Sequence, residues 1–262
     1  MEKYASLEIR DHVAEIRLQR ASKRNALKRD FIEQLTESVD RVTTNANIRV
    51  LLISAEGTVF CAGMDLGEMQ QRATSNDGKQ QWRKDSEVYA ELLSKLFYLD
   101  IPTVVKLQGP VLAGGVGLVL ACDFIIASET AFFMLPEPMR GITAAMVTPF
   151  LVYRAGGGSA THLLLSGERL SAVDSRTVGL SHDVVEETQL DSRVDSLIAS
   201  ILTGSRSALA ITKKHVQNCV PLDLKQHLQN SINISAEARE TQDAREGLSA
   251  FLEKRKPNWQ PE

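Results

Sequence analysis

The sequence predicts an α/β fold that ends in a helical region, and two patterns carry this prediction. In the first, short apolar runs typical of strands alternate with segments whose apolar residues recur at helical spacing. Strands are expected at 6–10, 12–19, 49–54, 103–107 and 124–127, and helices at 28–44 and 79–99. Strand, helix and strand in this order indicate α/β architecture. In the second pattern, the chain becomes mostly helical after residue 145.

Local signals define the individual elements. The apolar residues that identify the strand at 12–19 are Val13, Ile16 and Leu18. Those at helical spacing in 28–44 are Phe31, Leu35, Val39 and Val42. The buried strand at 49–54 contains Val50, Leu51, Leu52 and Ile53. A glycine-rich turn is expected at 114–117, between the last two strands, and it runs into an apolar helix that ends near Cys122 and Asp123. Ser171 followed by Asp174 is a capping box that opens a short helix.

The helical region is expected to contain three helices between residues 190 and 255, broken near Gly204 and Pro221. Proline cannot continue a helix, so a new one restarts after it. We therefore divide the chain into an α/β core at 1–195 and a helical region at 196–262. The apolar residues Leu224, Leu228 and Ile232 are expected to form an exposed face that a neighbouring subunit buries.

Bulk composition excludes several functions. The 262 residues are 43% hydrophobic and 24% charged with a net charge of −3, which gives no electrostatic signal for nucleic acid or an anionic membrane. The odd number of cysteines (Cys61, Cys122, Cys219), without close pairs, argues against disulfides and zinc clusters, so all three are expected to be reduced and buried. Without a leader or spanning pattern the cytoplasm is expected, with a processed organellar protein left open.

Two loops have the composition of ligand-binding backbone. Small residues in 60–66 let a ligand approach the main chain, and Asp65 is placed to cap the helix that follows. Gly114, Gly115 and Gly117 do the same after another buried strand, without matching the dinucleotide pattern G-x-G-x-x-G. Taken alone, each loop is explained equally well as a tight turn where a strand packs closely against a helix, with no role in ligand binding. Together they could donate one N–H each to a single carbonyl oxygen, which is an oxyanion hole.

A candidate proton-transfer residue follows. Glu137 lies between Pro136 and Pro138, which are expected to hold the backbone extended. Its neighbours 133–135 are apolar, so the pKa of the carboxyl should be raised, which suits proton transfer near neutral pH. In isolation Glu137 reads as a surface-turn acid.

At this point the sequence resembles the crotonase (enoyl-CoA hydratase/isomerase) superfamily almost from end to end. The resemblance is carried by 23–27 (KRNAL), 60–66, 114–123, 136–141, 165–167 (LSG) and 246–257 (EGLSAFLEKRKP). It implies a ββα spiral core with a C-terminal helical trimerisation region, a homotrimer or hexamer, and an acyl-CoA substrate. It implies no cofactor, since coenzyme A is part of the substrate, and no metal.

The resemblance also implies roles at matching positions. Ala62 and Gly114 would supply the oxyanion N–H groups, and Glu137 would be one of two catalytic acids. The implied CoA-binding set is Lys23 and Arg24 near the phosphates, Met64 near the adenine, Ala26, Ala62, Asp65, Leu66 and Gly114, and Phe251 and Lys254 from a neighbouring subunit.

Two departures from the family pattern concern the mechanism. Hydratases of this family usually carry a second glutamate where this chain has Gly117, and a usual Pro and Gly pair is replaced by Ala144 and Ala145. Glu68 and Glu129 are nearby in sequence, but nothing favours either as a substitute. A hydratase stays the leading interpretation, with a Δ3,Δ2-enoyl-CoA isomerase or a catalytically silent acyl-CoA-binding protein as alternatives.

The acyl pocket is expected to be shaped by the stretch 70–90. Its members of interest are Gln70, Arg72, Gln80, Trp82 and Tyr89. Their polarity favours an acyl group other than a plain fatty chain.

Overall fold

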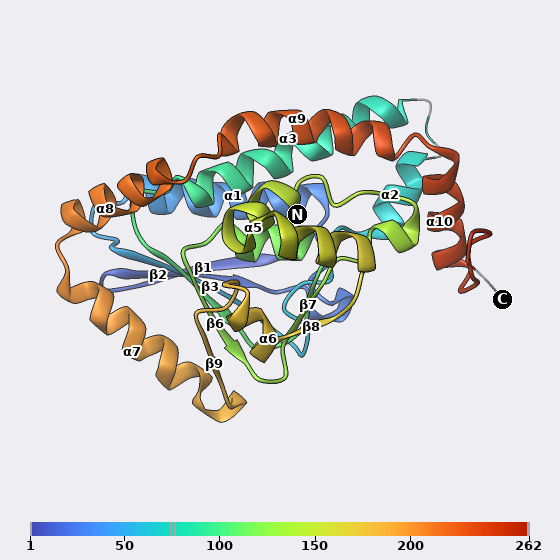
Figure 1. Ribbon diagram of the computed structural model, residues 1–262. Coiled ribbons are helices and arrows are strands. Elements are labelled where there is room, and N and C mark those ends of the chain that lie inside the picture. Colours follow the sequence, from blue (N-terminus) through green and yellow to red (C-terminus); the bar gives the residue numbers. More distant parts are fainter. Residues whose placement is uncertain (1, 74, 76, 261–262) are drawn as a thin grey trace.

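A computed structural model of the chain describes residues 2–260 apart from positions 74 and 76, and its main sheet is six-stranded (Figure 1). In spatial order the strands are β1 (Ala5–Arg10), β2 (Val13–Leu18), β3 (Val50–Ala55), β4 (Thr103–Leu107), β6 (Phe124–Ser128) and β9 (Asp183–Val185). β1 pairs with β2 antiparallel and the remaining pairs are parallel. A smaller sheet contains β5 (Val111–Leu112), β7 (Phe132–Met134) and β8 (Leu170–Ser171). The predicted α/β class is confirmed.

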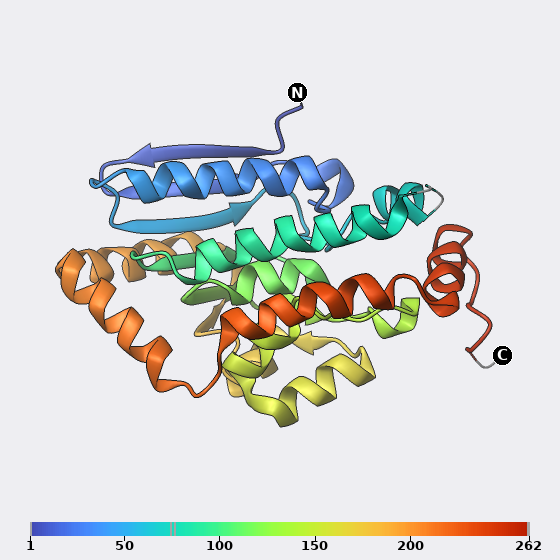
Figure 2. The same ribbon diagram turned by 90° about the horizontal axis from the view of Figure 1, so that it is seen from above.

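Helices cover both faces of the main sheet. On one side lie α1 (Arg29–Thr44) and α3 (Gly78–Phe97), with α9 (Leu224–Ala238) packed along α3, and on the other side lies α7 (Leu190–Thr203) (Figures 1 and 2). Strand β3 is buried on both faces, because Leu51 and Ile53 join the main core while Val50 and Leu52 join the cluster under α7. This explains its continuous apolar run.

The glycine-rich segment already belongs to the helix that was predicted to follow it, so it does not form a separate turn. Gly114 opens α4 (Gly114–Leu120), all of whose residues are buried. An ideal Cβ at Gly115 would lie 2.8 Å from the Cβ of Cys61, so a larger residue could not approach the neighbouring loop this closely. Tertiary packing has therefore overridden the weak helix propensity of glycine.

The C-terminal part contains four helices among the described residues, where three were predicted. They are α7, α8 (Arg206–Cys219), α9 and α10 (Gln242–Leu252). The predicted breaks near Gly204 and Pro221 are confirmed, and a further break precedes Thr241, whose hydroxyl accepts from the Ala244 N–H at 3.0 Å. The predicted capping box is also confirmed, since the Ser171 hydroxyl accepts from the Asp174 N–H at 3.0 Å. The remaining helices are α2 (Leu66–Ala73), α5 (Thr148–Ser166), α6 (Ala172–Thr177) and the 3-10 turns η1 (Ala21–Lys23), η2 (Pro138–Arg140) and η3 (Glu187–Gln189).

Helix α9 corrects one expectation about the surface. Leu224, Leu228 and Ile232 are only 2%, 3% and 4% exposed because α9 packs on α3 within the same chain. They belong to the main core and so do not form the exposed apolar face that was expected. The division of the chain at residue 195 stays a prediction.

The cysteines are free, and two of the three are buried as expected. Cys219 is exposed, contrary to expectation, because it ends α8, a helix without buried residues. Among the described residues no single helix has the length and apolar character to cross a bilayer. One bent pair (187–203 with 206–219, at 104°) is long and apolar enough on length and composition alone.

Candidate active site

Two backbone segments, 61–64 and 111–114, meet at the N-terminus of α4 and form the base of the site. Cys61 pairs with Val111 in a parallel bridge, and the Leu112 N–H donates to the Cys61 carbonyl at 2.9 Å. Gly63 has a φ of +85°, and an ideal Cβ there would lie 2.5 Å from the Cβ of Ala113. Only glycine therefore allows the two segments to approach this closely.

The orientation of the backbone N–H groups corrects one sequence assignment. The Ala62 N–H donates to the Arg24 carbonyl at 2.9 Å, so Ala62 has no donor to offer a ligand. The turn at Gly63 reverses the pattern: in the part of the chain that the structure describes, the N–H groups of Met64 and Gly114 have no protein acceptor. An ideal Cβ at Gly114 would lie 3.8 Å from the Met64 nitrogen, so the two groups are neighbours. The available pair is thus Met64 and Gly114.

Asp65 holds this corner in place. Its carboxylate accepts from the Gly67 and Glu68 N–H groups at 2.9 and 3.3 Å, which confirms the predicted cap of α2. It also pairs with Arg20 at 2.7 Å. Burial alone would raise the pKa of Asp65, but the Arg20 guanidinium and the two N–H groups hold it below its usual value. Arg20 also donates to the Ala26 carbonyl at 2.7 Å, so it ties 20–27 to this loop.

Glu137 lies at the start of η2 with its side chain turned inward. Its backbone is helical (φ −55°, ψ −46°) rather than extended as predicted, because its carbonyl accepts from the Arg140 and Ile142 N–H groups at 2.9 and 3.1 Å. The residue is 6% exposed, and among the described residues its Oε2 atom has no hydrogen-bond partner. Burial raises the pKa of the Glu137 carboxyl to about 7, against smaller opposing effects that include Arg140 and Arg239. The predicted direction is confirmed.

The acid and the two N–H groups share one cavity. Glu137, Met64 and Gly114 line it together with Tyr89, and the end of α9 contributes Arg239. Ala144 and Ala145, which form the second departure noted in the sequence, also line it. A ligand in this cavity would contact a proton-transfer group and a pair of backbone donors at once.

Tyr89 occupies the space that a side chain at position 117 would need. An ideal Cβ on Gly117 would lie 2.8 Å from the Tyr89 hydroxyl oxygen and 3.4 Å from Val147 Cγ2. The Tyr89 hydroxyl donates to the Gly114 carbonyl. Burial raises the pKa of Tyr89 well above its usual value, so the hydroxyl stays protonated. The place of a second acid is thus filled by a neutral donor.

Glu68 and Glu129, the two glutamates considered as substitutes, do not replace the acid that is missing at position 117. Glu68 is 2.7 Å from Arg72 and accepts from the Arg29 N–H at 3.1 Å. It lines a neighbouring cavity with Leu27 and Asp85 rather than the one around Glu137. Glu129 is exposed.

The expected CoA residues lie in two places. Lys23 and Arg24 are exposed at η1, and Leu66 lines the Glu137 cavity. Phe251 is 48% exposed and lies under the Arg140 guanidinium, whose carbon is 4.5 Å from the ring centre. Lys254 is exposed just beyond α10, which packs on η2 and α2. Their joint action across subunits stays a prediction.

Of the stretch expected to shape an acyl pocket, only part lines the cavities beside Glu137. Trp82 and Tyr89 do, whereas Arg72 is engaged by Glu68 and Asp85, and Gln80 is exposed. The basic residues 140, 239 and 245 were missed. No local signal marks them, because they come together only when α10 packs on η2.

Comparison with known proteins agrees with this architecture. The family model described as enoyl-CoA hydratase/isomerase matches residues 8–262. The chain is 30% identical to the 2,3-dehydroadipyl-CoA hydratase of Escherichia coli over 92% of both proteins. It is 31% identical to the mitochondrial enoyl-CoA hydratase domain-containing protein 2 of Mus musculus, over 94% of this chain and 84% of that protein. A crystal structure of an enoyl-CoA hydratase from Mycobacterium avium subsp. paratuberculosis superposes with a TM-score of 0.87 at 25% identity, covering 99% of both chains. The chain therefore belongs to the enoyl-CoA hydratase/isomerase (crotonase) family.

Proposed function

We propose that the protein is an enoyl-CoA hydratase that adds water to the double bond of a 2-enoyl-CoA thioester. One observation carries the proposal: a buried carboxyl with a pKa of about 7 shares a cavity with two unpaired backbone N–H groups. A carboxyl with this pKa is present in both protonation states near neutral pH, so it can take up a proton and return it.

The proposed mechanism uses one acid twice. The thioester oxygen accepts from the Met64 and Gly114 N–H groups, which stabilise negative charge as an enolate forms. Ionised Glu137 removes a proton from a water molecule, whose oxygen bonds to C3 while the electrons of the double bond move toward the thioester oxygen. Protonated Glu137 then delivers its proton to C2, the thioester carbonyl re-forms, and the product is a 3-hydroxyacyl-CoA.

A second candidate is the Δ3,Δ2-enoyl-CoA isomerase. The observation that favours it is the replacement of the second acid by Gly117 and Tyr89. Moving a proton from C2 to C4 requires one base and no water, so Glu137 could perform it alone. Most of the hydratase argument would still hold, because both reactions pass through an enolate.

The deciding experiment incubates the purified protein with 2-enoyl-, 3-enoyl- and 3-hydroxyacyl-CoA thioesters in water and in D₂O. A hydratase converts the 2-enoyl thioester to the 3-hydroxyacyl thioester with solvent deuterium at C2. An isomerase interconverts only the 2- and 3-enoyl thioesters. Neither turnover nor C2 exchange on any thioester, together with tight CoA binding, would support the catalytically silent binding protein and exclude both enzymes.

A further inference from the structure

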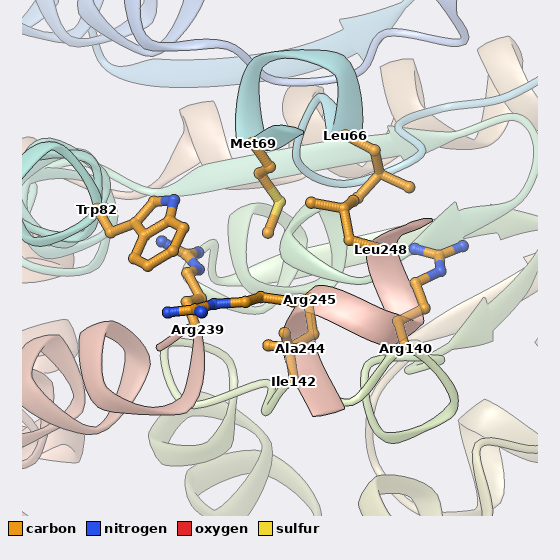
Figure 3. A pocket seen from close by; sticks show the side chains of 9 residues that line it. All are labelled: Leu66, Met69, Trp82, Arg140, Ile142, Arg239, Ala244, Arg245 and Leu248. Atoms are coloured by element: carbon orange, nitrogen blue, oxygen red, sulfur yellow. The ribbon is translucent and has the colours of Figure 1, made fainter. Parts of the chain in front are cut away.

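A second cavity continues the Glu137 cavity toward α10. The two cavities share Leu66, Met69, Arg140, Ile142 and Arg239 as lining residues. The farther one is completed by Trp82 of α3 and by Ala244, Arg245 and Leu248 of α10 (Figure 3). A ligand that places its thioester at Met64 and Gly114 and extends past Glu137 would therefore end in this second cavity.

The second cavity has an unusual charge. Of the described residues that line it, three are arginines and none is acidic. Figure 3 shows Arg239 overlapping the indole ring of Trp82 in this view, Arg245 on the same side of the cavity, and Arg140 on the far side of Leu248. Within the described residues none of the three forms an ion pair within 4.0 Å of a carboxylate. The rest of the wall is apolar.

Arg239 is the most confined of the three, and its surroundings do not neutralise it. Among the described residues its one side-chain hydrogen bond, to the Ser86 hydroxyl, is 3.5 Å long. Among the carboxylates, Asp85 has the largest influence on the Arg239 guanidinium, but Arg29 and Arg72 already pair with it at 2.7 and 2.9 Å. Burial lowers the pKa of the Arg239 guanidinium, while Asp85 and Glu137 only partly offset this. A buried charge without a close partner is costly, so an anion in the cavity would relieve it.

Trp82 provides a second, independent observation that the cavity is suited to a ligand with a hydrogen-bond acceptor. The residue is 6% exposed, and its indole Nε1 has no hydrogen-bond partner among the described residues. It lines the same cavity as Arg239 and Arg245. A buried indole N–H usually has an acceptor.

From these observations we propose that the substrate's acyl chain ends in a carboxylate, which Arg239 and Arg245 bind in the second cavity with Trp82 Nε1 as a further donor. The apolar walls formed by Leu66, Met69 and Leu248 hold the methylene groups that precede it. The substrate is thus a monothioester of a dicarboxylic acid. This inference rests on the proposed function, because it specifies the substrate of the same site.

The test compares acyl-CoA substrates that differ only at the end of the acyl chain remote from the thioester. Wild-type kcat/KM is measured on trans-2-enoyl-CoA thioesters of increasing length, each prepared with a terminal carboxylate, a terminal methyl group and a methyl ester of the carboxylate. A charge-assisted contact predicts a preference of about 10- to 100-fold for the carboxylate at the best length. Since all three carry the same coenzyme A, binding of its phosphates or of a free anion in this cavity would give no such preference.

Variants locate the preference. Arg239→Met and, separately, Arg245→Met should reduce the carboxylate-to-methyl ratio toward one, mainly through KM. The matched control is Arg83→Met: Arg83 lies on α3, as Trp82 does, but it is half exposed, bonds Glu87 at 3.0 Å and Asn233 at 2.9 Å, and does not line the cavity, so its ratio should equal the wild-type ratio. If Arg239→Met does not fold, the Arg245→Met variant and the comparison of the three wild-type substrates still test whether the cavity binds a carboxylate.

The outcomes separate this inference from the proposed function. Equal or better turnover of the methyl-ended chain by the wild type overturns the inference and leaves the hydratase intact. Absence of turnover and of C2 exchange on every thioester overturns the hydratase. In that case calorimetry with saturated acyl-CoA, carboxylate-ended against methyl-ended, still tests the cavity, and equal affinities would refute it.

Discussion

Glu137 is deeply buried, its Oε2 atom has no hydrogen-bond partner among the described residues, and this burial sets its pH behaviour. Its pKa of about 7 lies above the usual 4.5, because burial disfavours the charged form. If the ionised form starts the reaction, hydration kcat/KM should rise with pH and level off above pH 7. Glu137→Gln should lower kcat by about 10²-fold or more while acyl-CoA affinity is largely kept. Steady-state assays over a range of pH measure the pH profile and the loss of kcat, and titration calorimetry measures the affinity for acyl-CoA.

The same pKa predicts how stability depends on pH. Between pH 4.5 and about 7 the folded protein keeps the Glu137 proton that the unfolded chain has lost, so this residue lowers stability as pH rises through that window. Glu137→Gln removes the effect. The variant should gain roughly 1–3 kcal/mol over the wild type above pH 7, and little below pH 4.5. Urea unfolding at both ends of this range tests it, and a constant difference would contradict the burial argument.

Gly117 and Tyr89 have to be changed as a pair. Gly117→Glu alone places a side chain 2.8 Å from the Tyr89 hydroxyl, so we expect reduced stability and activity rather than a better hydratase. With Tyr89→Ala added, the carboxylate gains room, and hydration should recover relative to either single variant. A double-mutant cycle on kcat/KM measures the coupling. Additive effects would mean that Tyr89 does not occupy the position of the second acid.

At the scale of elements, the turn at Gly63 aligns the two N–H donors. Gly63→Ala puts a Cβ 2.5 Å from Ala113 at a φ of +85°, so stability should fall by about 1–3 kcal/mol and kcat by about 10²-fold. Gly157→Ala is the matched control, because no atom lies within 4 Å of its ideal Cβ. Thermal unfolding and kcat are compared for the two variants. Equal, small effects would show that the turn does not position the donors.

The η1 turn carries the CoA prediction. Arg24→Glu should weaken CoA and acyl-CoA alike, whatever the acyl group, and more strongly at low ionic strength because exposed charges are screened by salt. Arg10→Glu, also exposed but on β1, serves as the control. Titration calorimetry at two salt concentrations measures the change. Unaltered CoA affinity in Arg24→Glu would place the phosphates elsewhere.

Sequence patterns predicted most elements because their signals are local. β4 was placed at its observed bounds from a buried apolar run, and α6 from its capping box. The errors arose where contacts distant in sequence decide. Gly114 begins a helix because it packs against the 61–64 loop, and Ala62 was misassigned because the direction of an N–H depends on the turn at Gly63. Arg239 could not be found, since only the packing of α9 on α3 brings it to Glu137.

At the scale of the whole molecule, assembly stays a prediction with a revised basis. The face first considered is internal, but α8 has no buried residues and exposes Ile211 (70%) and Val216 (54%). We expect a trimer or a dimer of trimers that covers this face. Light scattering at micromolar concentration tests it, and Ile211→Lys should lower the mass whereas Lys225→Ala should not. A monodisperse wild-type monomer would contradict it.

The placement of α9 and α10 has a consequence for the order of events during synthesis. Leu224, Leu228 and Ile232 complete the main core, and Ala244 and Leu248 close the second cavity. While the ribosome still holds these helices, the outer face of α3 has no cover and the cavity has only part of its wall. We therefore expect a nascent chain to present an apolar stripe open to chaperones, and to complete the second cavity only after α10 has emerged.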